Sequence, residues 1–267
     1  MATLGRSDEI IVMLNSLVSQ TYKNFELIII DQNENDIVFK ICEEYKDKIE
    51  LKYIHNDKKG LSINRNIGLK YMSGDIAAFP DDDCIYETDT LEKALNFFNE
   101  NVNYSFYICN TMDIQGNGSI LKTKSKNADI SIFNFTNSGI SFTIFIRTPA
   151  IKTFMFDENL GLGTNFGSGE ESDLILFLLK NRNKGRYIFK NYIYHPVKKD
   201  TPDKAFEYGK GFGAIYKKAV FHYGFYLLLP VFFLRILKGI INIIIYKNKE
   251  YRSASLNGRL TGFNKYK

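Results

Sequence analysis

The feature that most constrains the fold is a nearly continuous apolar run, FELIII at positions 25–30, which ends in Asp31. Such runs are typical of parallel strands that are buried on both faces of a sheet. Helical and extended patterns alternate around it up to about residue 100. We expect helices over 10–18, 37–45, 62–71 and 91–98, and strands over 25–30, 49–55 and 76–79. This order predicts an α/β fold with a mostly parallel sheet flanked by helices.

The pattern becomes mixed after residue 100. Strands are predicted over 104–112 and 120–123, and Gly116-Asn117-Gly118 between them indicates a hairpin. A further strand is expected over 140–146. The second half is therefore predicted to combine strands and helices less regularly than the first.

The segment from Ala219 to Tyr246 is strongly apolar, but Pro230, Arg235 and Lys238 interrupt it. An uninterrupted membrane span needs about 20 apolar residues. We therefore favour amphipathic or re-entrant helices that lie in a membrane interface over a true span. The alternative is a pair of helices packed on the rest of the protein.

Composition excludes several classes of protein. The chain has 267 residues, enough for a large core, and its three cysteines are too few and too far apart for a disulfide framework or a cysteine zinc site. The net charge of +5 comes without a long basic run, which argues against a nucleic-acid binder and is compatible with phosphates or an anionic membrane. Arg6, Asp8 and Glu9 interrupt the first apolar segment, so a signal peptide is not expected.

Acidic residues follow two of the predicted strands. Asp31-Gln32 closes one strand, and Asp81-Asp82-Asp83 closes the strand over 76–79. Ligands of α/β sheets bind at the carboxyl ends of strands. Two carboxylates one residue apart can hold a hard divalent cation that also binds a diphosphate, with Asp81 and Asp83 facing the metal and Asp82 turned away or bonded to backbone. A solvated acidic turn is the alternative interpretation.

The third acidic feature is GSGEESDLILFLLK at 167–180, where glycines lead into Glu170-Glu171 and then into an amphipathic helix. Carboxylates in a first helical turn are stabilised by the helix dipole, which is sufficient reason for them to be there. A carboxylate on a glycine-flanked turn can also approach a substrate hydroxyl and take its proton.

The order of these features resembles the family 2 inverting glycosyltransferases of the GT-A fold. The resemblance rests on SLVSQTYKNFELIIIDQNEND (16–36), KGLSINRNIGLKYMSGDIAAFPDDDC (59–84) and FDENLGLGTNFGSGEESDL (156–174). It covers most of residues 2–196 and implies transfer of a sugar from a nucleoside diphosphate. It also implies three parts: a nucleotide-sugar half (1–100), an acceptor half with the base (101–204) and membrane-associating helices (205–267).

The resemblance assigns roles to matching positions. Asp31 and Gln32 are expected at the nucleobase and ribose; Gln32 stands where aspartate is common, and its amide could pair with uracil. Arg65 matches a basic residue near the nucleotide, or it forms a salt bridge with the acidic turn. Glu171 matches the general base and Glu170 is the alternative. The other residues placed at the nucleotide are Thr3, Arg6, Asp81 and Asp82.

The metal is expected to be Mn²⁺ or Mg²⁺, held by Asp81 and Asp83. His195, in YIYHPVKK, completes the metal shell in this interpretation, and an ordinary structural hydrogen bond is its alternative. A UDP-sugar donor is favoured. The acceptor is expected to be a saccharide, lipid-linked at the cytoplasmic face of the membrane, in capsule or cell-surface polysaccharide synthesis.

One departure from the family pattern concerns the beginning of the chain. Family members begin with a strand of about six apolar residues, whereas this chain begins Met1-Ala2-Thr3. We expect either a start inside a longer reading frame or a truncated chain. A non-catalytic membrane-associated scaffold and a sugar-nucleotide nucleotidyltransferase are the competing functions.

Overall fold

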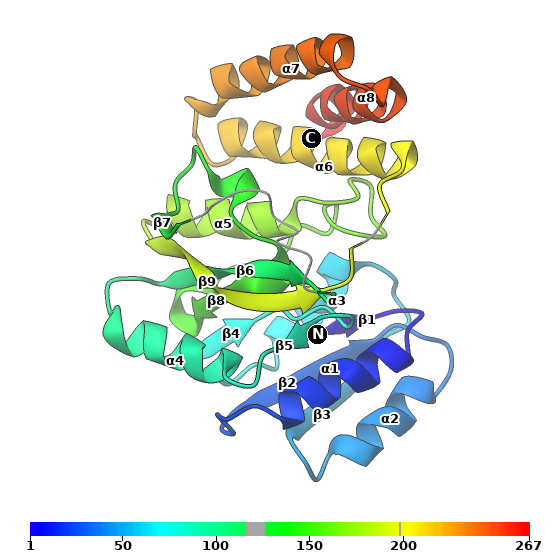
Figure 1. Cartoon of the computed structure of the whole chain (residues 1–267), viewed down its shortest axis with the longest axis vertical. Coiled ribbons are helices and arrows are strands. Elements are labelled where there is room, and N and C mark those ends of the chain that lie inside the picture. Colours follow the sequence, from blue (N-terminus) through cyan, green and yellow to red (C-terminus); the bar gives the residue numbers. More distant parts are fainter. Residues whose placement is uncertain (116–125, 198) are drawn as a thin grey trace.

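The computed structural model describes residues 1–115, 126–197 and 199–267 (Figure 1). The predicted hairpin turn at 116–118 and the strand over 120–123 lie outside these residues. The predicted α/β class is confirmed: helices cover two sheets, one entirely parallel and the other mixed.

The first sheet comprises β1 (Ala2–Thr3), β2 (Glu26–Asp31) and β3 (Glu50–His55), all parallel and in that order. The apolar run over 25–30 is thus the central strand, as its burial on both faces predicts. Helices α1 (Asp8–Val18) and α2 (Ile37–Tyr45) lie beside this sheet (Figure 1).

The second sheet has the order β4-β8-β6-β9-β5, with β7 paired to β9. Its strands are β4 (Ile76–Ala78), β5 (Ile85–Tyr86), β6 (Phe106–Asp113), β7 (Ala128–Asp129), β8 (Ile144–Arg147) and β9 (Gly185–His195). The β6–β9 pair is parallel and the other pairs are antiparallel. The strand predicted over 140–146 was too long at its start, because Ser141–Thr143 form a 3₁₀ turn in which the Thr143 amide donates to the Ile140 carbonyl.

Three helices connect or cover these strands: α3 (Leu61–Leu69), α4 (Thr90–Glu100) and α5 (Glu170–Lys180). Two short 3₁₀ segments flank the second sheet, Phe135–Asn137 and Thr148–Ile151. Apolar side chains of α5, including Leu174 and Leu178, are fully buried against this sheet. The buried apolar stripe of α5 therefore fixes the orientation of its acidic first turn.

The last helices, α6 (Pro202–Phe221), α7 (Leu228–Ile245) and α8 (Lys249–Lys265), stack at the end of the molecule opposite β1–β3 (Figure 1). Helices α6 and α8 meet at glycines: a Cβ at Gly213 would lie 2.0 Å from the Arg259 carbonyl oxygen, and one at Gly262 1.9 Å from that of Lys210. Pro230 does not interrupt α7, because it sits in the first turn, where no intrahelical donor is required. The helix is long and apolar enough to cross a membrane, and 11% of it is buried.

Candidate functional site

The aspartate turn after β4 lies against the end of β9. The Nε2 atom of His195 is 3.0 Å from an Asp83 carboxylate oxygen, and ligand atoms of Asp81, Asp83 and His195 all lie within 4.8 Å of one another. His195 is brought there because β5, which directly follows the turn, pairs with β9 in the register Ile85↔Tyr194. Its ring stacks on Phe142, with centroids 4.7 Å apart.

These three side chains fit a divalent cation. Two carboxylates and one imidazole form a compact donor set that suits Mn²⁺ or Mg²⁺, with the imidazole favouring Mn²⁺. Asp83 is buried, and Asp81 and His195 are partly exposed. An ion held by them would therefore remain reachable from solvent or from a bound ligand.

Asp82 is also engaged, but by side chains rather than by backbone. Its carboxylate accepts a 2.7 Å hydrogen bond from the Thr3 hydroxyl and lies 3.2 Å from the Arg6 guanidinium, which also pairs with Asp83. Asp82 lies outside the cluster of Asp81, Asp83 and His195, which agrees with the expectation that it turns away from the metal, whereas the alternative bond to backbone was wrong. Thr3 ends β1 beside the turn and presents its hydroxyl to Asp82. Burial raises the pKa of Asp82, and the bond from Thr3 opposes that shift.

Arg65 connects the aspartate turn to the acidic helix start. Its guanidinium lies 3.0 Å from Asp81 and 3.2 Å from Glu170, and it donates a 2.7 Å hydrogen bond to the Ser141 hydroxyl. The side chain is 3% exposed. The salt-bridge interpretation of Arg65 is thus confirmed, while its predicted contact with a nucleotide stays a prediction.

Glu170 and Glu171 begin α5, after Gly169 in the left-handed conformation at φ 102°. A side chain at Gly169 would be strained there, which explains the glycine before the acidic pair. Glu170 is buried and bonded to Arg65, whereas Glu171 is half-buried. Burial, followed by the neighbouring charge of Glu170, raises the pKa of Glu171 to about 8.

A cavity of about 720 Å³ joins both groups of residues. Asp81, His195, Glu170 and Glu171 all contribute to its wall. Helix α6 also contributes to this wall through Lys204 and Tyr208, two residues that the sequence patterns did not indicate. Their only signal in the sequence was a polar face preceding the apolar tail.

Asp31 and Gln32 lie away from this cavity wall. Asp31 is fully buried; its carboxylate accepts hydrogen bonds from the Asn33 amide at 2.9 Å and the Tyr53 hydroxyl at 2.9 Å. The Gln32 side chain donates to the Thr3 carbonyl and accepts from the Gly60 amide. Both side chains therefore brace the strand ends, and their predicted nucleobase contacts stay predictions.

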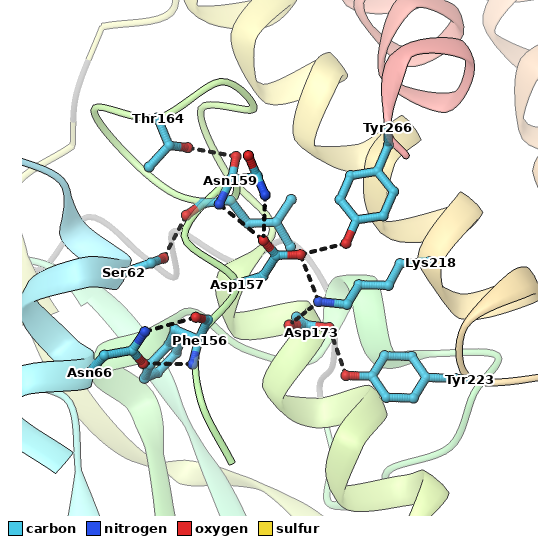
Figure 2. A network of polar contacts seen from close by, with 11 residues as sticks. Ser62, Asn66, Phe156, Asp157, Asn159, Thr164, Asp173, Lys218, Tyr223 and Tyr266 are labelled. Atoms are coloured by element: carbon cyan, nitrogen blue, oxygen red, sulfur yellow. Dashed lines mark hydrogen bonds and ion pairs between the residues drawn. The ribbon is translucent and has the colours of Figure 1, made fainter. Parts of the chain in front are cut away.

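A buried polar network ties α6 to α5 (Figure 2). The Lys218 ammonium lies 2.8 Å from Asp157 and 2.9 Å from Asp173, and the Tyr223 hydroxyl donates to Asp173 at 2.8 Å. Tyr266 donates to Asp157. Burial tends to raise the pKa of Asp157, but its bonds from Lys218 and Tyr266 prevail and lower it. The network holds the helix that carries Glu170 and Glu171 against the C-terminal helices.

Comparison with known proteins decides the family. Residues 1–166 match the profile described as glycosyl transferase family 2. The chain belongs to this family. The match includes the aspartate turn and Arg65 but ends before α5, so the acidic pair is placed by the structure rather than by the profile.

Family 2 relatives are found in several bacteria. An uncharacterized glycosyltransferase of Rickettsia felis is 30% identical over 179 residues, which cover 64% of this chain and 28% of that protein. One of Haemophilus influenzae is 33% identical over 149 residues, 53% of this chain and 58% of that protein. The Staphylococcus aureus poly(ribitol-phosphate) beta-N-acetylglucosaminyltransferase TarP is 26% identical over 207 residues, 75% and 62% of the two chains. This family 2 chain thus spans less than two thirds of these relatives.

Solved structures share the GT-A fold. Staphylococcus aureus TarS in complex with UDP-GlcNAc superposes with a TM-score of 0.66 at 18% identity, over 98% of this chain and 89% of that one. The Pyrobaculum calidifontis mannosyltransferase in complex with GDP-Man and Mn²⁺ gives 0.67 at 13% identity, over 98% and 85%. At these identities the likeness establishes the fold of this family 2 member and no more.

Proposed function

We propose that the protein is a metal-dependent inverting glycosyltransferase that moves a sugar from a nucleoside diphosphate to a hydroxyl of a saccharide acceptor. One observation carries the proposal: Asp81 and His195 of the candidate metal cluster line the same cavity as the Glu170–Glu171 pair, and Arg65 joins Asp81 to Glu170. Family membership favours sugar transfer over nucleotidyl transfer.

The residues of the cavity divide into a donor side and a base side. A divalent ion bound by Asp81, Asp83 and His195 would neutralise the diphosphate that leaves. The Arg6 guanidinium pairs with Asp82 and Asp83, and the Thr3 hydroxyl donates to Asp82. These contacts hold the two aspartates of the turn in place. The donor is proposed to be a UDP-sugar, which is supported by the UDP-GlcNAc bound in TarS.

Glu171 is proposed to act as the general base. The acceptor oxygen attacks the anomeric carbon, the bond to the diphosphate oxygen breaks, and the hydroxyl proton passes to the Glu171 carboxylate, so that configuration inverts in one step. Glu170 is less suited to this role, because its carboxylate is already paired with Arg65 at 3.2 Å. Because Arg65 pairs with Glu170, the Glu171 carboxylate remains the one available to take the hydroxyl proton.

The acceptor is proposed to be a lipid-linked saccharide of a bacterial cell-surface polymer, at the cytoplasmic face of the cell membrane. The name of TarP supports a cell-wall polymer as acceptor class. The α7 apolar face supports the location; we define it as Phe233, Leu234, Leu237, Ile241, Ile244 and Ile245, all exposed. Lys238, Lys247 and Lys249 are exposed beside it, as expected for a helix lying on an anionic membrane.

A transfer assay tests the proposal. The full chain is incubated with Mn²⁺, a panel of UDP-sugars and lipid-linked saccharides, and products are read by mass spectrometry and by NMR of the new anomeric centre. An acceptor mass raised by one sugar, with inverted configuration, is expected. Absence of transfer with every donor, from protein that still binds UDP, would favour the non-catalytic scaffold instead.

A further inference from the structure

Two arginines of the C-terminal helices lie over one aromatic side chain of α6. The Arg259 guanidinium of α8 is 4.6 Å from the centroid of the Phe212 ring, and the Arg235 guanidinium of α7 is 5.7 Å from the same centroid. Arg235 is also 5.9 Å from the ring centroid of Tyr216, one turn further along α6. The two cations therefore meet where α6, α7 and α8 pack together, and the mechanism proposed above assigns no role to them.

Neither guanidinium has a carboxylate partner within the described parts of the chain. Arg6 and Arg65 pair with acidic side chains there, whereas no such ion pair is formed by Arg235 or Arg259. The Nε atom of Arg259 is buried and has no hydrogen-bond partner among the described residues. Burial, followed by the positive charge of Arg235, lowers the pKa of Arg259. A buried cation is normally offset by an anion, and here that anion would have to come from a ligand.

Phe212 connects the arginine pair to the cavity that Glu171 lines. The Phe212 side chain contributes to the wall of that cavity, as does Tyr208 one turn earlier in α6. Figure 1 shows α6 between α5, which carries Glu171 in its first turn, and the helices α7 and α8 that carry the arginines. A group bound at the arginines would therefore lie beside the cavity, with one aromatic ring between them.

The α7 apolar face begins next to the arginine pair. Phe233 and Leu234, two exposed members of that face, directly precede Arg235 in the helix, whereas Arg235 itself is half-buried. An anionic site and an exposed apolar surface thus lie on the same helix, within one turn of each other. A ligand with a charged head and a hydrocarbon chain would match both features at once.

We propose that Arg235 and Arg259 bind the phosphate or diphosphate group of a lipid-linked acceptor, whose saccharide reaches the cavity and whose hydrocarbon chain lies along the α7 apolar face. A guanidinium presents its N–H donors in a planar fork that matches two phosphate oxygens. The phosphate would also supply the negative charge that the described residues do not provide at this pair. The identity of the acceptor rests on the proposed function, whereas phosphate binding by the pair does not.

Isothermal titration of the full chain with pyrophosphate and with farnesyl diphosphate tests the site, with EDTA present so that no metal contributes. We expect both to bind to the wild type. Arg259→Gln should weaken each by at least about 10-fold, because it removes charge-assisted hydrogen bonds to the phosphate. Arg259→Lys keeps the charge but not the planar fork, so it should recover part of the affinity. Arg252→Gln is the matched control, since it removes another α8 guanidinium that lies over an aromatic ring, and should bind as the wild type does.

Two outcomes would overturn the inference. Equal affinity of the wild type and Arg259→Gln for both diphosphates would exclude the arginine pair as their site. Weaker sedimentation of Arg259→Gln with phosphatidylglycerol vesicles, beside an unchanged affinity for farnesyl diphosphate, would replace the acceptor phosphate with a phospholipid headgroup. Arg259→Lys keeps the test informative if Arg259→Gln fails to fold. None of these measurements requires sugar transfer, so the site and the proposed activity can fail separately.

Discussion

The guanidinium of Arg65 lies 3.2 Å from the carboxylate of Glu170, although the two residues are 105 positions apart. The same guanidinium is 3.0 Å from Asp81, so one buried cation joins the aspartate turn to the acidic start of α5. The two adjacent glutamates consequently differ in their surroundings: the Glu170 carboxylate is paired with Arg65, and Glu171 is the residue that we propose takes the proton.

Replacing Glu171 by Gln is expected to lower the transfer rate by about 10²- to 10⁴-fold, because the amide cannot accept the acceptor proton. UDP affinity should be almost unchanged, since Glu171 is not one of the clustered metal-ligand residues Asp81, Asp83 and His195. The measurement is kcat with UDP-sugar and acceptor, beside a UDP titration of the same protein. Retained transfer by Glu171→Gln would remove Glu171 from the base role and return attention to Glu170.

The pH profile should show the raised pKa of Glu171. Because the base works in its ionised form, the transfer rate is expected to rise with pH through about 8. Glu170→Gln removes the neighbouring negative charge that contributes to this pKa, so the rise should move to lower pH. Rates measured from pH 5.5 to 9.5 for both proteins check this; a profile whose rise does not move would contradict the coupling.

Sequence patterns predicted the features that depend on local spacing. The central strand, the turn Asp81–Asp83 and the acidic start of α5 were all placed correctly, because each combines a buried element with polar residues at its end. The pairing of Arg65 with Glu170 could not be predicted from local spacing, because the two residues are 105 positions apart and meet only in the tertiary structure. The contribution of Tyr208 was hidden for the same reason.

Metal binding should depend on the three clustered ligands. Asp83→Asn is expected to weaken Mn²⁺ binding by at least about 10-fold, because it removes the carboxylate that is buried beside His195. The free Mn²⁺ signal in electron paramagnetic resonance gives the affinity directly. Asp89→Asn, on an exposed ion pair with Lys93, serves as the matched control and should bind as the wild type does. Equal affinity of the two variants would exclude the cluster as the metal site.

The network in Figure 2 predicts a large stability effect at Lys218. Lys218→Met leaves Asp157 and Asp173 without their shared cation, in a site where the lysine side chain is 14% exposed, and should cost about 3 kcal/mol of unfolding free energy. Urea unfolding measures it. Lys93→Met, in a more exposed pair, should cost less than about 1 kcal/mol. Similar losses for both would mean that the buried network contributes no more than a surface pair.

The α7 apolar face predicts membrane binding. The double variant Leu234→Asp with Leu237→Asp should lose sedimentation with vesicles rich in phosphatidylglycerol, since two charges oppose insertion of that face. Val102→Asp, at a residue 74% exposed elsewhere, is the control and should bind as wild type does. Higher salt should weaken wild-type binding through its lysine contacts. Wild-type protein that stays in the supernatant, or that forms a dimer through α7, would contradict a membrane location.

The central claim is that the Asp81–Asp83–His195 side of the cavity binds a nucleoside diphosphate through a divalent ion, and isothermal titration of UDP tests it most directly. We predict UDP binding with Mn²⁺ that EDTA abolishes, that Asp83→Asn weakens by at least about 10-fold and that Glu171→Gln leaves unchanged. UDP binding of equal strength with Mn²⁺, with EDTA and in Asp83→Asn would contradict the account.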